Sequence, residues 1–340
     1  MVVGIETDTE LADTVVKLSR KGRDLLRKKN YSESEQVFKE ALDLDSNNTY
    51  VLVGLADLHR QKRNFPDAVS YYDRVLEIDE NNVFALRGAG DSYRGMRDPS
   101  KSISYWKRYL DNNQDDFQVI VRIGDSYKKL NKVDIAEEYY LKAIKLSPKD
   151  RFALFGLGEL YYKNNKLVES LDYFDQLLSI EEGHIHVLTM AGNASRRLKE
   201  YERGKKYYQR TLNQDPKNCF ALYGIGDCIR GLGNLNEAID WWLKLLDIDP
   251  VNQSVLSRIG DSYSQLGNTE MAMNYFTRCM AIGFNPYAHL GMATLYAAQY
   301  KFDAAIKNIK VVLEHTPDDD RALELLSDII EQKNTAGEMS

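Results

Sequence analysis

The sequence has few cysteines and prolines and no long apolar run. Its 340 residues include three Cys and seven Pro. Cys219, Cys228 and Cys279 form no CxxC pair, which favours reduced thiols in a cytoplasmic protein. No segment has the roughly 20 consecutive apolar residues that a membrane-spanning helix needs. The first residues, MVVGIETDTE, lack a basic start followed by an apolar run, so we expect no signal peptide.

A large excess of charge of one sign is also missing. The formal net charge is −6, with 28% charged and 43% hydrophobic residues. This balance suits a folded, soluble chain. It gives no general attraction to nucleic acid phosphates or to acidic membrane surfaces, so we expect neither as a partner.

Tyrosine, by contrast, is abundant, and its placement follows a period of 34 residues. The chain has 22 Tyr. The hexapeptide RIGDSY occurs at Arg122–Tyr127 and again at Arg258–Tyr263, which is four periods later. We count repeat position 1 at Val15 and step by 34 residues. The predicted organisation is a lead-in at 1–14, nine repeats (15–48, 49–82, 83–116, 117–150, 151–184, 185–218, 219–252, 253–285 and 286–319), a capping helix at 320–333 and a flexible tail at 334–340.

Small and aromatic residues recur at fixed positions of the repeat. Position 8 is always Gly or Ala, and position 20 is always Ser, Ala or Gly. Because Gly inside a helix costs about 1 kcal/mol, its recurrence indicates a close crossing of two helices. The apolar spacing predicts two amphipathic helices per repeat, separated by a polar break. Position 24 is aromatic in eight repeats: Phe38, Tyr72, Trp106, Tyr140, Phe174, Tyr208, Trp242 and Phe276.

This pattern resembles the tetratricopeptide repeat (TPR) over residues 15–319, with ALFGLGELYYKNNKLVESLDYFDQLLSI at 153–180 as a clear example. The resemblance implies an all-α fold, a right-handed α-solenoid (TPR superhelix) of helix-turn-helix repeats with a concave groove and a C-terminal capping helix. In this frame Ile123, Gly124 and Tyr127 are packing residues. The Arg and Asp of RIGDSY are not needed for packing, so they are the residues to examine for function.

In the TPR family the groove is lined mainly by positions 2, 5, 9, 12 and 13 of the first helix. In this chain that stripe carries aromatic, acidic and basic residues, and Tyr287 is a further aromatic at position 2. The i,i+3 aromatic pairs at 152/155 and 220/223 favour binding. The charges have a simpler alternative, pairing at i,i+3 and i,i+4 along each helix, and both interpretations stay open. The residues expected to line the groove are Tyr50, Phe84, Arg87, Asp91, Arg94, Asp125, Lys128, Phe152, Phe155, Glu159, Phe220, Tyr223, Asp227 and Arg230.

The sequence gives little support for other kinds of ligand or for catalysis. The family's clamp for terminal carboxylates needs Asn or basic residues at position 9, where this chain is mostly acidic, so we predict against that ligand. The GxG triplets fall inside predicted helices and indicate packing rather than phosphate binding. His184 and His186 lack further ligands at metal spacing. We therefore expect no catalytic residue, no metal site and no cofactor.

The sequence predicts a cytoplasmic, non-catalytic interaction scaffold that binds a peptide or protein segment in the groove. The alternative is a regulatory subunit that acts on an enzyme, or self-assembles, through its ends. Residues 17–29 are mainly basic and residues 314–331 mainly acidic. We expect a mostly monomeric protein whose opposite end charges allow at most weak head-to-tail self-association.

Overall fold

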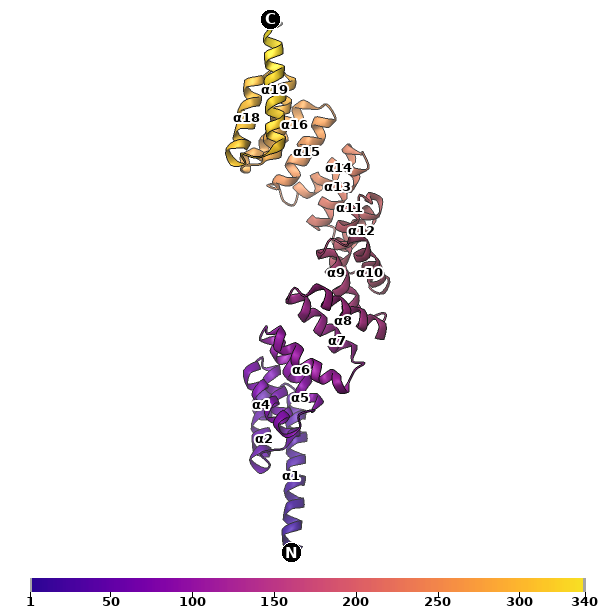
Figure 1. The fold of residues 1–340 in the computed structure, drawn as a ribbon, viewed down its shortest axis with the longest axis vertical. Coiled ribbons are helices and arrows are strands. Elements are labelled where there is room, and N and C mark those ends of the chain that lie inside the picture. The colour runs from indigo at the N-terminus through magenta and orange to yellow at the C-terminus, as the bar shows by residue number, and fades with distance from the viewer. Residues whose placement is uncertain (1, 339–340) are drawn as a thin grey trace. The chain divides into compact units, whose positions relative to one another are not determined.

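The protein is all-α. The computed structural model describes residues 2–338, with side chains for residues 10–336, and this part of the chain forms nineteen helices and no strand (Figure 1). It divides into two compact units, unit 1 at Met1–Asn164 and unit 2 at Asn165–Ser340. Within residues 2–338, none of the helices combines the length and the apolar character that a membrane crossing requires.

The helices follow one another with short turns. Unit 1 contains α1 (Val2–Arg27), α2 (Tyr31–Leu44), α3 (Thr49–Gln61), α4 (Phe65–Ile78), α5 (Val83–Gly95), α6 (Pro99–Asn112), α7 (Phe117–Lys129), α8 (Val133–Leu146) and α9 (Arg151–Lys163). Unit 2 contains α10 (Leu167–Ile180), α11 (Ile185–Arg197), α12 (Tyr201–Gln214), α13 (Cys219–Gly231), α14 (Leu235–Leu246), α15 (Gln253–Gln265), α16 (Thr269–Ile282), α17 (Pro286–Ala298), α18 (Phe302–His315) and α19 (Asp320–Glu338).

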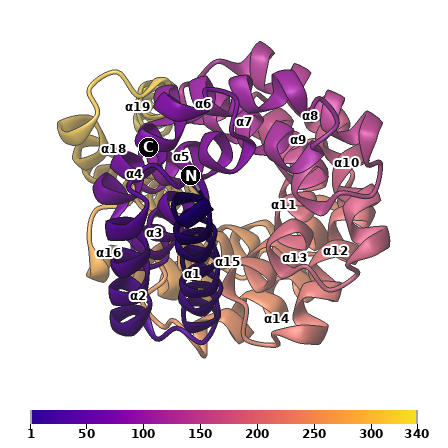
Figure 2. The same ribbon diagram turned by 90° about the horizontal axis from the view of Figure 1, so that it is seen from below.

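Within each unit the chain builds a solenoid of helical repeats. The odd-numbered helices up to α17 are the first helices of the repeats. Figure 2 shows those from α1 to α15 along one side and their even-numbered partners along the other. Each first helix from α3 to α17 starts after an Asn, Asp or His whose side chain accepts a hydrogen bond from the backbone N–H three residues later. Such a cap satisfies an N–H that the helix itself cannot pair. His184 is one of these caps.

The aromatic ring at position 24 explains the small residues of the pattern. The rings of Tyr140 and Tyr208 are buried between first helices. A Cβ added at Gly192 would lie 2.7 Å from the Tyr208 ring of the same repeat, and one at Gly224 would lie 2.2 Å from that ring in the next repeat. The two glycines of a GxG triplet therefore face two rings, the first glycine that of the preceding repeat and the second that of its own repeat, and a side chain at either would displace the ring.

The turn inside each repeat places position 15 in the left-handed region. The residues with positive φ are Lys29, Arg63, Arg97, Asn131, Asn165, Lys199, Gly233, Gly267 and Tyr300. This conformation costs most non-glycine residues about 1–2 kcal/mol, so the five turns with Lys, Arg or Tyr are strained, while Asn131 and Asn165 adopt it more readily.

Substitutions at this position are expected to change stability in opposite directions. Lys199→Gly should raise the free energy of unfolding by about 1 kcal/mol, because glycine adopts positive φ without steric cost. Gly233→Ala should lower it by a similar amount, although a Cβ at Gly233 would meet no atom within 4 Å. Urea denaturation of both variants measures the effect, and shifts of equal sign would contradict the backbone explanation.

The two ends extend the helices beyond the predicted repeats. α1 begins at Val2, so it includes most of the segment that we expected to lead into the first repeat. α19 runs from Asp320 to Glu338 and continues past 333 into the expected flexible tail, since neither Pro nor Gly interrupts it before Gly337. Met1 and residues 339–340 lie outside the described part of the chain.

Candidate functional site

A pocket of about 340 Å³ lies between α5, α7 and α9 in unit 1. Its walls include the apolar side chains of Phe117, Val121 and Phe152 and the charged side chains of Arg94 and Asp125. Arg94, Asp125 and Phe152 are among the residues that the sequence predicted for the groove. The ring of Phe152 is 67% exposed, so it is available to a ligand.

Basic side chains surround this pocket. An adjoining pocket of about 630 Å³ is lined by Arg94, Lys128, Lys129 and Lys163 against two acids, Asp125 and Glu159. Desolvation alone would raise the pKa of Glu159, but hydrogen bonds from Lys128 and Lys163 outweigh it and lower that pKa. A third pocket, of about 370 Å³, includes Arg94, Arg97 and Lys129. Positive charge therefore exceeds negative charge beside the apolar pocket.

In the repeats with Tyr or Trp at position 24, that residue determines the contacts of the polar residue at position 9. Where position 24 is Tyr, its hydroxyl donates to position 9 of the same repeat: Tyr72 to Asp57 at 2.6 Å, Tyr140 to Asp125 at 2.6 Å and Tyr208 to Asn193 at 2.7 Å. Burial, and then the Asp125 carboxylate, raise the pKa of Tyr140, which keeps its hydroxyl a donor.

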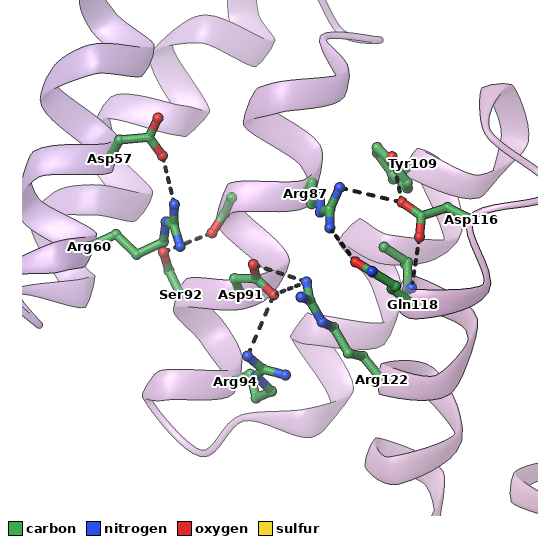
Figure 3. Close-up of polar contacts among 12 residues, drawn as sticks. Asp57, Arg60, Arg87, Asp91, Ser92, Arg94, Tyr109, Asp116, Gln118 and Arg122 are labelled. Atoms are coloured by element: carbon green, nitrogen blue, oxygen red, sulfur yellow. Dashed lines mark hydrogen bonds and ion pairs between the residues drawn. The ribbon is translucent and has the colours of Figure 1, made fainter. Parts of the chain in front are cut away.

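Where position 24 is Trp, no hydroxyl is available and an arginine of the next repeat takes its place. Figure 3 shows Asp91 between Arg94 and Arg122, and Arg87 pointing to Asp116. Arg122 Nη1 donates to both Asp91 oxygens at 2.9 and 3.1 Å. The pKa of Arg122 is lowered, first by desolvation, which outweighs Asp91, and then by the neighbouring Arg94 and Arg87. Arg87, Arg94 and Arg122 therefore gather around two carboxylates, those of Asp91 and Asp116.

Unit 2 repeats this arrangement after its own tryptophan, Trp242. Asp227 is buried, with 4% of its side chain exposed, and lies 2.6 Å from Arg196 and 3.2 Å from Arg258. Arg258 Nε also donates to the hydroxyl of Tyr223 at 2.7 Å. Because the Asp227 carboxylate is enclosed by these arginines, a ligand on this surface would meet the arginines first.

In unit 2, a pocket of about 630 Å³ lies between α13, α15 and α17. Tyr223 and Arg230, which the sequence predicted for the groove, line it together with Arg258, Asp261 and Tyr287. Arg321 from the start of α19 adds a third guanidinium and lies 4.7 Å from the centroid of the Tyr287 ring.

The other predicted groove residues occupy different environments. Phe84 and Phe220 project into solvent, with 70% and 75% exposure. Tyr50 is 49% exposed, and Arg23 stacks 3.6 Å above its ring centroid. Phe155 is half-buried.

Pairing of charges along the helices, the simpler alternative from the sequence, is present in part. Arg60 lies 3.0 Å from Asp57, and Lys163 lies 2.8 Å from Glu159. Other pairs join neighbouring repeats instead, such as Lys128 with Glu159 at 2.8 Å. Exposed pairs within one helix contribute little, whereas these contacts between repeats also align adjacent first helices.

Comparison with known families identifies the architecture. One tetratricopeptide repeat model matches residues 19–83, 121–183 and 189–252, and a second matches residues 254–282. The first model alone covers more than half of the chain. The chain belongs to the tetratricopeptide repeat family. TPR arrays are protein-interaction scaffolds, which supports such a role here.

Solved TPR structures share the fold at low sequence identity. The C-terminal part of a TPR repeat-containing protein from Cytophaga hutchinsonii superposes with a TM-score of 0.62 at 18% identity, covering 71% of this chain and 99% of that one. A TPR protein from Parabacteroides merdae gives 0.51 at 17%, covering 73% and 98%. PilF of Pseudomonas aeruginosa gives 0.53 at 15%, covering 62% and 96%. No curated protein matches the sequence.

The sequence singled out the RIGDSY arginines, Arg122 and Arg258, for function, but the list of expected groove residues did not include them. Arg122 and Arg258 stand at position 6, where five other repeats carry Gly, and each follows a tryptophan by 16 residues (106 to 122 and 242 to 258). That spacing was visible in the sequence and could have linked the two residue types. Among the described side chains, no cluster of three or more His, Cys, Asp or Glu is arranged to hold a metal ion.

Proposed function

We propose that this TPR protein is a non-catalytic scaffold that binds an extended segment of a partner protein along the first helices of unit 1. The observation that supports it best is the pocket between α5, α7 and α9, where an exposed Phe152 faces apolar and basic walls. Sites of this composition, concave and apolar with a few convergent polar groups, are typical of ligand binding. The groove position of these residues is also what the family resemblance implies.

The chemistry of the walls indicates the class of segment. An apolar side chain would fill the space beside Phe117, Val121 and Phe152. A neighbouring carboxylate would approach Arg94 or Lys129, which are exposed. Charge-assisted hydrogen bonds to arginine fix orientation, and burial of an apolar group supplies most of the affinity.

Selection from a phage-displayed library of random twelve-residue peptides tests this proposal. We expect enriched peptides to combine Asp or Glu with Leu, Ile or Phe. Phe152→Ala should weaken the best peptide at least about tenfold, because one buried aromatic contact is worth roughly 1.4 kcal/mol or more. Fluorescence anisotropy with the labelled synthetic peptide measures the change.

A matched control separates binding from folding. Tyr300 is 78% exposed and lies outside the pockets described above, so Tyr300→Ala should leave peptide affinity unchanged. Both variants should melt as the wild type does, since each removes an exposed ring. Enrichment of no peptide, or equal binding by Phe152→Ala and wild type, would reject the unit 1 site.

Self-assembly through the oppositely charged ends is the weaker candidate. In α1, Lys17, Lys21 and Asp24 are exposed at positions 3, 7 and 10, which α7 buries as Val119, Ile123 and Ser126. Polar residues in place of buried ones are what a solvated terminal repeat requires. The charges of α1 therefore have a sufficient explanation as a cap.

A further inference from the structure

The pockets of the two units are built from the same positions of the repeat. Arg94, Arg122 and Asp125 in unit 1 correspond to Arg230, Arg258 and Asp261 in unit 2, each 136 residues later. Phe152 corresponds to Tyr287, which is one residue nearer because the predicted eighth repeat, 253–285, is one residue short. The duplicated RIGDSY lies at the centre of both.

The contacts that the pocket arginines make with tryptophan and aspartate are also duplicated. Arg94 lies 5.9 Å from the ring centroid of Trp106, and Arg230 lies 5.9 Å from that of Trp242. In both units the RIGDSY arginine pairs with the position 9 aspartate of the preceding repeat. Only the repeats 83–116 and 219–252 have Trp at position 24, and in both cases the next repeat has Arg at position 6. Packing of the helices does not require Trp at position 24 followed by Arg at position 6, since other repeats pack with Tyr at position 24 followed by Gly at position 6.

We propose that the unit 2 pocket is a second copy of the unit 1 binding site, so that one chain holds two peptide segments of the same chemical class. The class is an acidic segment with an apolar side chain beside the carboxylate. This inference rests on the proposed function of unit 1. The natural partner would then carry two copies of one motif, or two partner molecules would be brought together on one chain.

Beside the unit 1 pocket, Arg94, Arg97 and Lys129 line the adjoining pocket of about 370 Å³ with no acidic side chain, which favours an acidic segment. In unit 2, Arg230, Arg258 and Arg321 line the pocket, and they pair with Asp261 at 3.5 Å, Asp227 at 3.2 Å and Asp319 at 2.7 Å. The cap residue Asp150 of the unit 1 pocket is replaced by the neutral Asn285 in unit 2. The unit 2 pocket also has the larger volume, about 630 against 340 Å³. We therefore expect it to accept the same peptide with a larger salt dependence, because more of its affinity is electrostatic.

Isothermal titration with the synthetic peptide enriched on the wild-type chain tests the second site. The wild type should bind two peptides per chain. Phe152→Ala and Tyr287→Ala should each bind one with unchanged affinity at the remaining site, and the double variant should lose at least about tenfold at both. Tyr287 is 61% exposed, so its removal should not unfold unit 2. Arg122→Lys and Arg258→Lys keep the positive charge but remove the planar guanidinium with its paired N–H donors. Each should weaken peptide binding at one site.

Matched arginine controls lie outside the pockets on second helices. Arg108 and Arg210 donate to the carbonyls of Glu80 and Glu182 at 2.8 and 2.9 Å, and their glutamine variants should bind two peptides. One peptide per chain, sensitive to Phe152→Ala but not to Tyr287→Ala, would overturn the second site and leave the proposed function intact. Two peptides with no effect of Tyr287→Ala would also overturn it. Enrichment of no peptide would reject both proposals together.

Discussion

Replacement of Trp242 by alanine is expected to lower the free energy of unfolding by about 3–5 kcal/mol, the usual cost of deleting a large buried ring. Trp242 is fully buried, and its Nε1 lies 3.3 Å from the carbonyl of Tyr223. The adjacent Trp241 is only partly buried at the edge of the same cluster, so Trp241→Ala should cost clearly less. Guanidinium denaturation of both variants provides the comparison, and equal losses would contradict the assignment of Trp242 to the core.

A double-mutant cycle tests the ring–glycine contact directly. A Cβ at Gly226 would lie 2.4 Å from Trp242 Nε1, so Gly226→Ala should cost about 1–3 kcal/mol in the wild type. In the Trp242→Ala background the ring is gone, and the same change should stabilise by up to about 1 kcal/mol through helix propensity. A coupling near zero would mean that the glycine is required for another reason.

Removal of the Asp227 carboxylate is expected to cost about 3 kcal/mol, because Asp227→Ala leaves the half-buried Arg196 and Arg258 without the buried carboxylate that both pair with. The control is Asp303→Ala. Asp303 pairs with Lys333 at 2.6 Å, but 89% of its side chain is exposed, so its loss should stay within about 0.5 kcal/mol. Thermal melts of the two variants distinguish a bridge between repeats from a surface pair, and similar small losses would show that the Asp227 pairs add nothing.

The helical repeat could be predicted from the sequence because each pattern has a local steric cause. A ring at position 24 needs a small residue at position 8 of its own repeat, and that requirement recurs in eight of the nine repeats, so it sets the period. The same logic placed Phe152 and Phe220 on the surface, since nothing in the packing pattern needs a ring at position 2.

The polar contacts could not be predicted in the same way. Whether Asp125 or Asp91 binds a tyrosine or an arginine depends on the hydroxyl at position 24 and on a neighbour about one repeat away. The positive φ of Lys199 and Tyr300 was also hidden, because these residues do not usually adopt it. The division of the chain at Asn164 falls in the turn of a predicted repeat, where the sequence shows no linker composition.

The tryptophan-dependent contact changes what can be moved between TPR arrays by recombination. Asp91 lies on α5, Trp106 on α6 and Arg122 on α7, so the interdependent residues span three helices rather than the two of one repeat. A graft that ends after α6 would leave Asp91 without Arg122, its main ion-pair partner. It would also pack Trp106 against a first helix from another protein. A graft that ends after α7 keeps all three. For this protein the cassette that transfers intact is therefore one and a half repeats long.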